Sequence, residues 1–208
     1  MWTAEKRGSG QPVSSYQVIA AVSRALRRLL WEQFDEDPVV RDIVGSEMAI
    51  VFDNPTDTAT DTANRLSLWL YEITENEFVK NQPPARDNGP ETVRIAPLAL
   101  NFNYLVTPFG RSGEADLLLL GKTMQVLYDN ATTLLADADN NAEELHIVLR
   151  RLTLEELTLV WQALRESYRL SVCYEVRVAQ VESLRTETAA VVTERHVTVA
   201  APPFNGTG

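Results

Sequence analysis

Residues Ala96–Thr107 read APLALNFNYLVT and carry the clearest strand pattern in the chain. Large apolar or aromatic side chains fall on every second position, at Leu98, Leu100, Phe102, Tyr104 and Val106. Alternation of this length is typical of a half-buried strand, most often an antiparallel one. The turn-forming stretch Pro108–Gly113 follows directly and predicts the end of this strand.

A second strand is predicted on the N-terminal side, because Arg65–Thr74 alternates in the same way. The stretch between them includes Asn81–Gly89, which is rich in Pro, Asn and Gly, so we expect a hairpin with a long exposed tip. Further upstream, Met48–Phe52 is apolar and predicts a short strand. The polar segment Thr56–Asn64 predicts a mobile loop.

Three helices are predicted from apolar residues at helical spacing. The first covers Tyr16 to about Phe34, and Pro38 lies just past its end. The second runs from about Glu114 to Leu135. The third begins at Thr153, whose spacing to Glu156 is that of a capping box. The broad apolar set of the second helix predicts one side against the sheet and another facing a neighbouring subunit; it comprises Leu117, Leu118, Leu120, Met124, Leu127 and Leu134.

Two more strands complete the predicted sheet, a short one at Leu145–Leu149 and a long one at Tyr168–Val181. The order of elements predicts an α+β fold: a single domain with one mixed, mostly antiparallel sheet packed by helices. We expect a flexible leader at 1–15, the domain at 16–183 and a C-terminal arm at 184–208.

The composition favours an ordinary globular chain. Hydrophobic residues make up 45% and charged residues 23% of its 208 residues. The longest aliphatic run is Leu117–Leu120, which is too short to span a membrane, and the polar leader is unlike a secretory signal. The formal net charge of −10 argues against nucleic-acid binding. The basic cluster Arg24, Arg27 and Arg28 is open to two interpretations, a solvated helix face or a binding patch.

No catalytic, cofactor or metal motif is recognised in the sequence. The two histidines, His146 and His196, are too few for a histidine-rich metal site. Cys173 lies in the middle of a predicted strand, where a buried and unreactive thiol is expected. Gly121-Lys122-Thr123 mimics the end of a phosphate-binding loop, but Asp116 stands where that motif needs glycine. We therefore expect no enzyme activity and no cofactor, and interpret Gly121 as a site of close helix packing.

Three blocks together resemble a known family. They are LSLWLYEITENEFVKNQ at Leu66–Gln82, APLALNFNYLVTPFG with EADLLLLGKTMQVLYDN in Ala96–Asn130, and the segment Leu152–Ser183. With the helix IAAVSRALRRLL, the chain is similar over most of Val18–Ser183 to the tail-terminator, or cap, family of extracellular contractile injection systems. These are particles derived from phage tails, with a tube, a contractile sheath and a baseplate.

The resemblance implies a function. It implies a structural cap that forms a homohexameric ring on the distal end of tube and sheath, ends polymerisation and joins the sheath protein to the inner tube protein. The alternative is another ring-forming component that completes the tube of the same particle. Such a protein is made in the cytoplasm and assembled into a particle that stays in the cell or is released. The family has no catalytic residues to transfer.

The C-terminal arm contains a further strand-forming stretch, Ala190–Val199. Its candidate contact residues are Val191, Val192, Val197 and Val199. We expect this stretch to bind the sheath by strand addition, or else to fold back on the edge of its own sheet. Trp69 and Tyr71 are similarly open to two interpretations, as interface aromatics or as residues buried under a helix.

Overall fold

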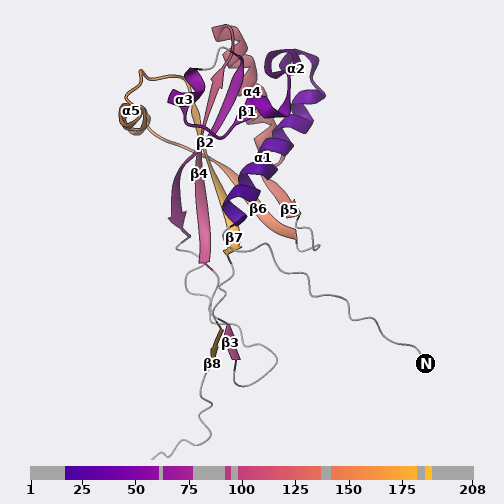
Figure 1. The fold of residues 1–208 in the computed structure, drawn as a ribbon, viewed down its shortest axis with the longest axis vertical. Helices are drawn as coiled ribbons and strands as arrows, with labels where there is room; N and C mark the ends of the chain where they lie inside the picture. Colours follow the sequence, from indigo (N-terminus) through magenta and orange to yellow (C-terminus); the bar gives the residue numbers. More distant parts are fainter. Residues whose placement is uncertain are drawn as a thin grey trace, which may run out of the picture.

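The computed structural model describes residues 17–60, 63–76, 92–94, 98–136, 142–181 and 186–188. Figure 1 shows a curved sheet with helices packed on it, which confirms the predicted α+β class. The helices in these residues are α1 (Val18–Asp35), α2 (Pro38–Val44), the 3₁₀ helix η2 (Glu47–Ala49), α3 (Pro55–Ala59), α4 (Gly113–Asp129) and α5 (Leu154–Ala163). The strands are β1 (Ile50–Val51), β2 (Arg65–Glu75), β3 (Thr92–Arg94), β4 (Leu98–Phe109), β5 (Thr132–Ala136), β6 (Ala142–Arg150), β7 (Val172–Val181) and β8 (Thr186–Thr188).

Six strands form the main sheet in the order β1-β2-β4-β7-β6-β5. Strand β1 runs parallel to β2, and all the other neighbouring pairs are antiparallel, so the sheet is mixed as predicted. The predicted hairpin pairs β2 with β4, and its tip at 81–89 lies outside the described residues. A separate two-stranded sheet joins β3 to β8.

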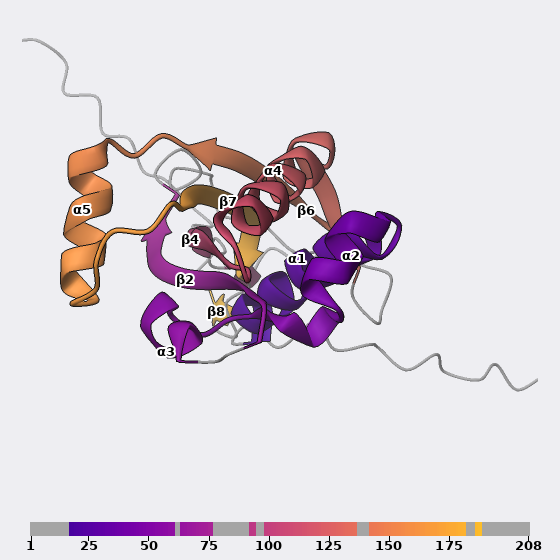
Figure 2. The ribbon, with the colours of Figure 1, turned by 90° about the horizontal axis from the view of Figure 1, so that it is seen from above.

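Helices α1, α2 and α4 cover one face of the main sheet, and Figure 2 shows α3 and α5 on the other side of β2 and β4. Helix α1 buries a stripe at four-residue spacing, which explains why its sequence forms a helix against a sheet. That stripe meets alternate residues of β2, β4, β6 and β7 in one core. Fully buried members include Val22, Leu30, Phe34, Leu66, Phe102, Tyr104 and Leu145.

Pro38 begins a second helix, which the sequence analysis did not predict. The Asp37 carboxylate caps α2 by accepting hydrogen bonds from the amides of Val39 and Val40, at 3.1 and 3.4 Å. Proline suits the first helical position, because the amide it lacks would have no partner there. Lys122 of α4 lies 3.5 Å from the same carboxylate, so this cap also ties α2 to α4.

The predicted helix to Leu135 is too long, because α4 ends at Asp129. Asn130 interrupts the helix, and its side chain donates a hydrogen bond to the carbonyl of Val126 at 2.9 Å. The following residues form β5, in which Leu134 is 63% exposed instead of lying on a helix face. Two adjacent threonines at the start of β5 favour a strand over a helix.

Four other segments differ from the predictions. Strand β4 continues through Pro108 to Phe109, which is possible because its pairing with β7 has ended at Val106. The predicted loop at 56–64 contains α3, which Asn54 caps by accepting from the amide of Asp57 at 2.9 Å. Residues 186–188, which were assigned to the C-terminal arm, form β8, and the predicted strand at 48–52 is only two residues long.

Candidate assembly surfaces

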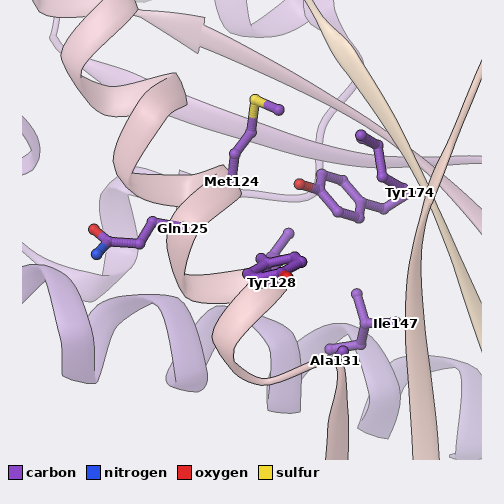
Figure 3. Close-up of a pocket in the computed structure, with 8 residues that line it drawn as sticks. Met124, Gln125, Tyr128, Ala131, Ile147 and Tyr174 are labelled. Atoms are coloured by element: carbon purple, nitrogen blue, oxygen red, sulfur yellow. The ribbon is translucent and has the colours of Figure 1, made fainter.

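An apolar pocket of about 330 Å³ opens between the second half of α4 and strands β6 and β7. Figure 3 shows the ring of Tyr174 directed from β7 towards α4, where Met124 and Tyr128 lie. Tyr128 is 82% exposed and Leu149 is 46% exposed, so the pocket is open to solvent. Its lining carries no charged side chain and consists of Met124, Gln125, Leu127, Tyr128, Ala131, Ile147, Leu149 and Tyr174.

The pocket suits an inserted apolar side chain better than a polar ligand. Ligand sites combine an apolar lining with a few polar groups that converge on the ligand. Here the polar groups are two tyrosine hydroxyls and the Gln125 amide, and burial raises the pKa of Tyr174, which keeps its phenol neutral. We therefore treat this pocket as a contact surface.

Helix α5 is the second candidate surface, because Trp161 is its only buried residue. The Trp161 indole donates a hydrogen bond to the Ser171 hydroxyl at 3.3 Å and packs edge-to-face on Tyr168. Leu154 and Leu159 remain 66% and 59% exposed. A helix that buries one residue and exposes two leucines is a candidate contact surface.

The apolar breadth of α4 was predicted from the sequence, whereas α5 was not predicted as a surface. As predicted, one side of α4 is buried, at Leu119, Leu120 and Leu127, while Leu117 stays 60% exposed. The signal for α5 was present in its sequence, LEELTLVWQA, which has more apolar residues than one buried face requires.

A polar cluster on the opposite sheet face links four strands around Cys173. The buried thiol lies 3.0 Å from the Tyr71 hydroxyl, and burial raises the pKa of Cys173, so it stays protonated. Arg150 donates to the Glu72 carboxylate at 2.7 Å, and the Asn103 amide donates to the same oxygen at 3.0 Å. The predicted burial of Cys173 is confirmed.

Trp69 lies beside Tyr71, with ring centroids 6.0 Å apart. Both aromatics are half-buried, so the interpretation that they are buried under a helix is wrong, and their role at an interface stays a prediction.

The other residues with possible chemical roles occupy structural positions. Gly121-Lys122-Thr123 lies within α4, and the Thr123 hydroxyl donates to the Leu119 carbonyl at 2.7 Å. The expected close packing at Gly121 is wrong, since a Cβ atom there would meet nothing within 4 Å. His146 is exposed, and no group of three or more potential metal ligands occurs in the described part of the chain.

The basic cluster of α1 is divided by the fold. Arg27 pairs with Glu47 at 3.2 Å and stacks over the Phe52 ring, whereas Arg24 and Arg28 are exposed. The predicted arm residues Val191, Val192, Val197 and Val199 lie outside the described residues. No helix within the described ranges is long and apolar enough to cross a membrane.

Comparison with known proteins now identifies the family. Residues 21–195 match the family model of the Pvc16 N-terminal domain. The chain belongs to this family. A search of curated proteins finds no match.

Two solved structures share the fold of this Pvc16 N-terminal domain family member. The sheath/tube terminator of PVC, an extracellular contractile injection system, in its extended state is 20% identical, with a TM-score of 0.62, and the match covers 96% of this chain and 67% of that one. The tube terminating cap of the anti-feeding prophage is 24% identical, with a TM-score of 0.60, over 89% of this chain and 63% of that one. The chain therefore spans about two thirds of their length. The tail-terminator fold expected from the sequence is confirmed.

Proposed function

We propose that this chain is a structural cap, or tail terminator, of a contractile injection system. The observation that carries the proposal is the terminator fold over 96% of the chain, within a family match at residues 21–195. The cap forms a homohexameric ring on the distal end of tube and sheath, stops their growth and joins them. Its partners are a second copy of itself, the sheath protein and the inner tube protein.

The surfaces of the described residues support an assembly role without catalysis. A closed ring joins unlike patches of neighbouring subunits head to tail. The apolar pocket beside α4 and the exposed helix α5 are two such patches. Figure 2 shows α4 and α5 on different sides of the molecule. We assign the ring contact to them, with Leu159 of one subunit at the pocket that Tyr128 borders on the next.

The C-terminal arm is proposed as the sheath contact. Val191, Val192, Val197 and Val199 give the stretch 190–199 a high strand propensity, and Pro202 and Pro203 end it. An extended arm adds to the edge of a partner's sheet through backbone hydrogen bonds, with little demand on side-chain fit. The chain is made in the cytoplasm and becomes part of the particle on assembly.

The proposal is tested by removing the chain from particle-producing cells and imaging the particles by negative stain. Cells that lack this chain are expected to produce tubes and sheaths of uncontrolled length. Expression of the wild-type chain in those cells is expected to restore the normal length. A labelled chain at the distal end in contact with both tube and sheath supports the cap. A label confined to the tube favours the alternative, a ring that completes the tube.

The ring contact has its own test in two variants. Leu159→Glu places a charge on the exposed face of α5 and is expected to abolish ring formation on tubes. Met48→Glu adds the same charge at a residue that is 69% exposed on η2, and is expected to leave rings intact. Rings that form equally well with Leu159→Glu would contradict this contact.

A further inference from the structure

Gly121 is a glycine that no contact within its own subunit explains. It lies in the middle of α4, where glycine weakens a helix relative to alanine. Its φ is not positive, and a Cβ atom there would meet nothing within 4 Å. Within the described residues, neither the backbone nor the packing therefore requires glycine at this position.

Arg165 is a second exception to the local rules. It follows the C-cap of α5 with a φ of 59°. Its amide donates to the Gln162 carbonyl at 3.0 Å, and the Glu166 amide donates to the Trp161 carbonyl at 3.2 Å. These bonds form a Schellman motif, in which glycine is the usual residue at this position. The Arg165 side chain is exposed and forms no ion pair within the described residues, so nothing there offsets its disfavoured backbone.

Gly121 leaves a gap in a row of exposed side chains on α4. Leu117 lies one turn before the glycine, and Gln125 and Tyr128 lie one and two turns after it, so all four share a face. Gln125 and Tyr128 also line the apolar pocket, and Figure 3 shows both on α4. This face is continuous with the pocket, and the gap at Gly121 lets another backbone approach closely.

Charge argues against a contact between two copies of this face. Glu114 stands at the start of α4 and Asp129 at its end, and both are exposed. Two α4 helices packed in the same direction would pair identical carboxylates, and in opposite directions they would set Glu114 against Asp129. Like charges across a contact cost free energy. The face therefore suits a different helix that carries a cation near its end.

Helix α5 of a second copy meets these requirements. It exposes two leucines, one of them Leu159, and Arg165 stands at its C-terminal end. Helix α1 carries exposed arginines but no exposed large apolar side chain. Helix α2 exposes Val39, but its Arg41 is already paired with Asp35 at 3.2 Å. Among the described helices, α5 alone combines exposed leucines with an exposed arginine that has no ion pair.

We propose that α5 of one subunit crosses α4 of the next at Gly121, with Leu159 beside the gap. Arg165 pairs with Asp129 of the next subunit. The rise from Leu159 to Arg165 along α5 is about 9 Å. The rise from Gly121 to Asp129 along α4 is about 12 Å, a difference that the long arginine side chain spans. This contact rests on the proposed function for the ring itself and assigns the residues that determine which surfaces meet.

The charges select the direction in which the two helices cross. When both run the same way, Arg165 lies by Asp129, and Glu155 at the other end of α5 lies towards Lys122. With α5 reversed, Arg165 would lie by Glu114. Glu155 would then lie by Asp129, and the two carboxylates would repel. We therefore expect the parallel arrangement.

Charge exchange tests the ion pair on purified tubes by negative stain. Arg165→Asp and Asp129→Arg are each expected to raise about tenfold the protein concentration at which half of the tubes carry a ring. The double variant restores an opposite-charge pair and is expected to need the wild-type concentration. Arg24→Asp makes the same change at an exposed arginine of α1 and is expected to leave ring formation unaltered.

A larger side chain at Gly121 tests the close approach. Gly121→Leu is expected to melt at or above the wild-type temperature, because leucine favours a helix and the position is open, but to form no rings. Ala20→Leu adds a leucine at an exposed position of α1 and is expected to form normal rings. Normal rings with folded Gly121→Leu, or a charge-exchanged double variant as defective as the single ones, would overturn the contact.

Failure of the cap itself would give a different result. Wild-type protein that forms no ring on tubes would refute the proposed function. Oxidative cross-linking of concentrated protein that carries Gly121→Cys and Leu159→Cys then still tests the contact, since the native Cys173 is buried. Bands larger than a dimer would support the contact, and bands that stop at the monomer or dimer would exclude it.

Discussion

At the scale of single residues, Tyr104 joins the helical layer to the sheet. It lies fully buried on the central strand β4, and its hydroxyl is 2.8 Å from the Ser23 hydroxyl of α1. Ser23 also donates to the Ile19 carbonyl at 3.1 Å, so the phenol extends a hydrogen-bonded chain from α1 into the core. Burial raises the pKa of Tyr104 to about 12, against the smaller lowering effect of its bond with Ser23.

Tyr104→Phe is expected to destabilise the fold by about 1 kcal/mol at neutral pH, because Ser23 keeps its bond to Ile19. The alkaline loss of folding stability is also expected to be smaller in Tyr104→Phe than in the wild type. A pKa raised from 10.0 to about 12 stabilises the fold below pH 10, and this contribution is lost as the pH rises through 12. Urea unfolding at neutral pH and at about pH 11 measures both effects.

Tyr128→Phe is the matched control, since Tyr128 is 82% exposed. It should unfold like the wild type at both pH values. Burial also raises the pKa of Tyr71 and Tyr174, so Tyr104→Phe should reduce the alkaline loss of stability without removing it. An unchanged alkaline loss in Tyr104→Phe would contradict the assignment to Tyr104.

At the scale of elements, α5 depends on its cap more than the packed helices do. The Thr153 hydroxyl accepts from the Glu156 amide at 3.2 Å, and the Glu156 carboxylate accepts from the Thr153 amide at 2.7 Å. This confirms the predicted capping box. With Trp161 as its only buried residue, α5 has little tertiary packing to replace a lost cap.

Thr153→Ala is expected to destabilise α5 locally by about 1 kcal/mol, while Thr153→Ser keeps the cap and the stability. Hydrogen exchange of the α5 amides measures this directly. The Thr153 amide and hydroxyl lower the pKa of Glu156 below 4.5, so the contribution is present above pH 4.5 and lost as the pH falls through the lowered value. Exchange rates that match in Thr153→Ala and Thr153→Ser would show that α5 is held without its cap.

Patterns that depend on one element alone were predicted from the sequence. The stripe of α1, the strands β2 and β4 and the cap of α5 were each predicted from within one element, and each was confirmed. The half-buried character expected of β4 is wrong, because all residues from Phe102 to Phe109 are buried. The helix predicted to Leu135 failed because Leu134 fits the apolar spacing of α4, whereas pairing with β6 makes it a strand. Strand β8 was missed for the same reason, since it depends on a partner that is distant in sequence, β3.

The candidate surfaces show a similar limit. The apolar residues of α4 were recognised, but the pocket also needs Leu149 and Tyr174, which the sheet order brings beside them. Helix α5 is exposed because few other elements pack against it. The sequence of α5 itself does not show which elements pack against it. The candidate residues of the C-terminal arm remain a prediction.

At the scale of the whole molecule, acidic charge dominates. The chain carries 29 acidic and 19 basic residues, for a net charge of −10. Several basic side chains already pair with carboxylates; in the described residues these include Arg27, Arg41, Lys122, Arg150, Arg169 and Arg177. These ion pairs offset part of the positive charge, and the net acidic charge disfavours contact with a phosphate backbone.

We therefore expect no shift of double-stranded DNA by micromolar protein at physiological salt in a gel assay. The exposed pair Arg24 and Arg28 is the place where this expectation could fail. Binding that weakens steeply with salt, and that Arg24→Ala with Arg28→Ala removes, would show that α1 carries a nucleic-acid patch.

The chain beyond β7 is expected to serve assembly and not folding. Strand β7 is the last strand of the main sheet, and β8 pairs with β3 in a separate sheet. Every buried apolar residue in the described part lies at or before Val176. A protein that stops after Ser183 therefore keeps the whole described core and should melt within a few degrees of the full chain.

Two truncations separate the arm from β8. Stopping after Thr188 removes the stretch 190–199 and keeps β8, whereas stopping after Ser183 removes both. If the arm is the docking strand, both proteins stay folded, and both lose sheath binding in co-sedimentation with purified sheaths. Loss only on stopping after Ser183 would move the contact to the β3–β8 sheet. A truncated protein that unfolds would place the arm in the core, because only removal of core contacts abolishes the cooperative unfolding transition. Normal capping by both truncated proteins would exclude the arm from sheath binding.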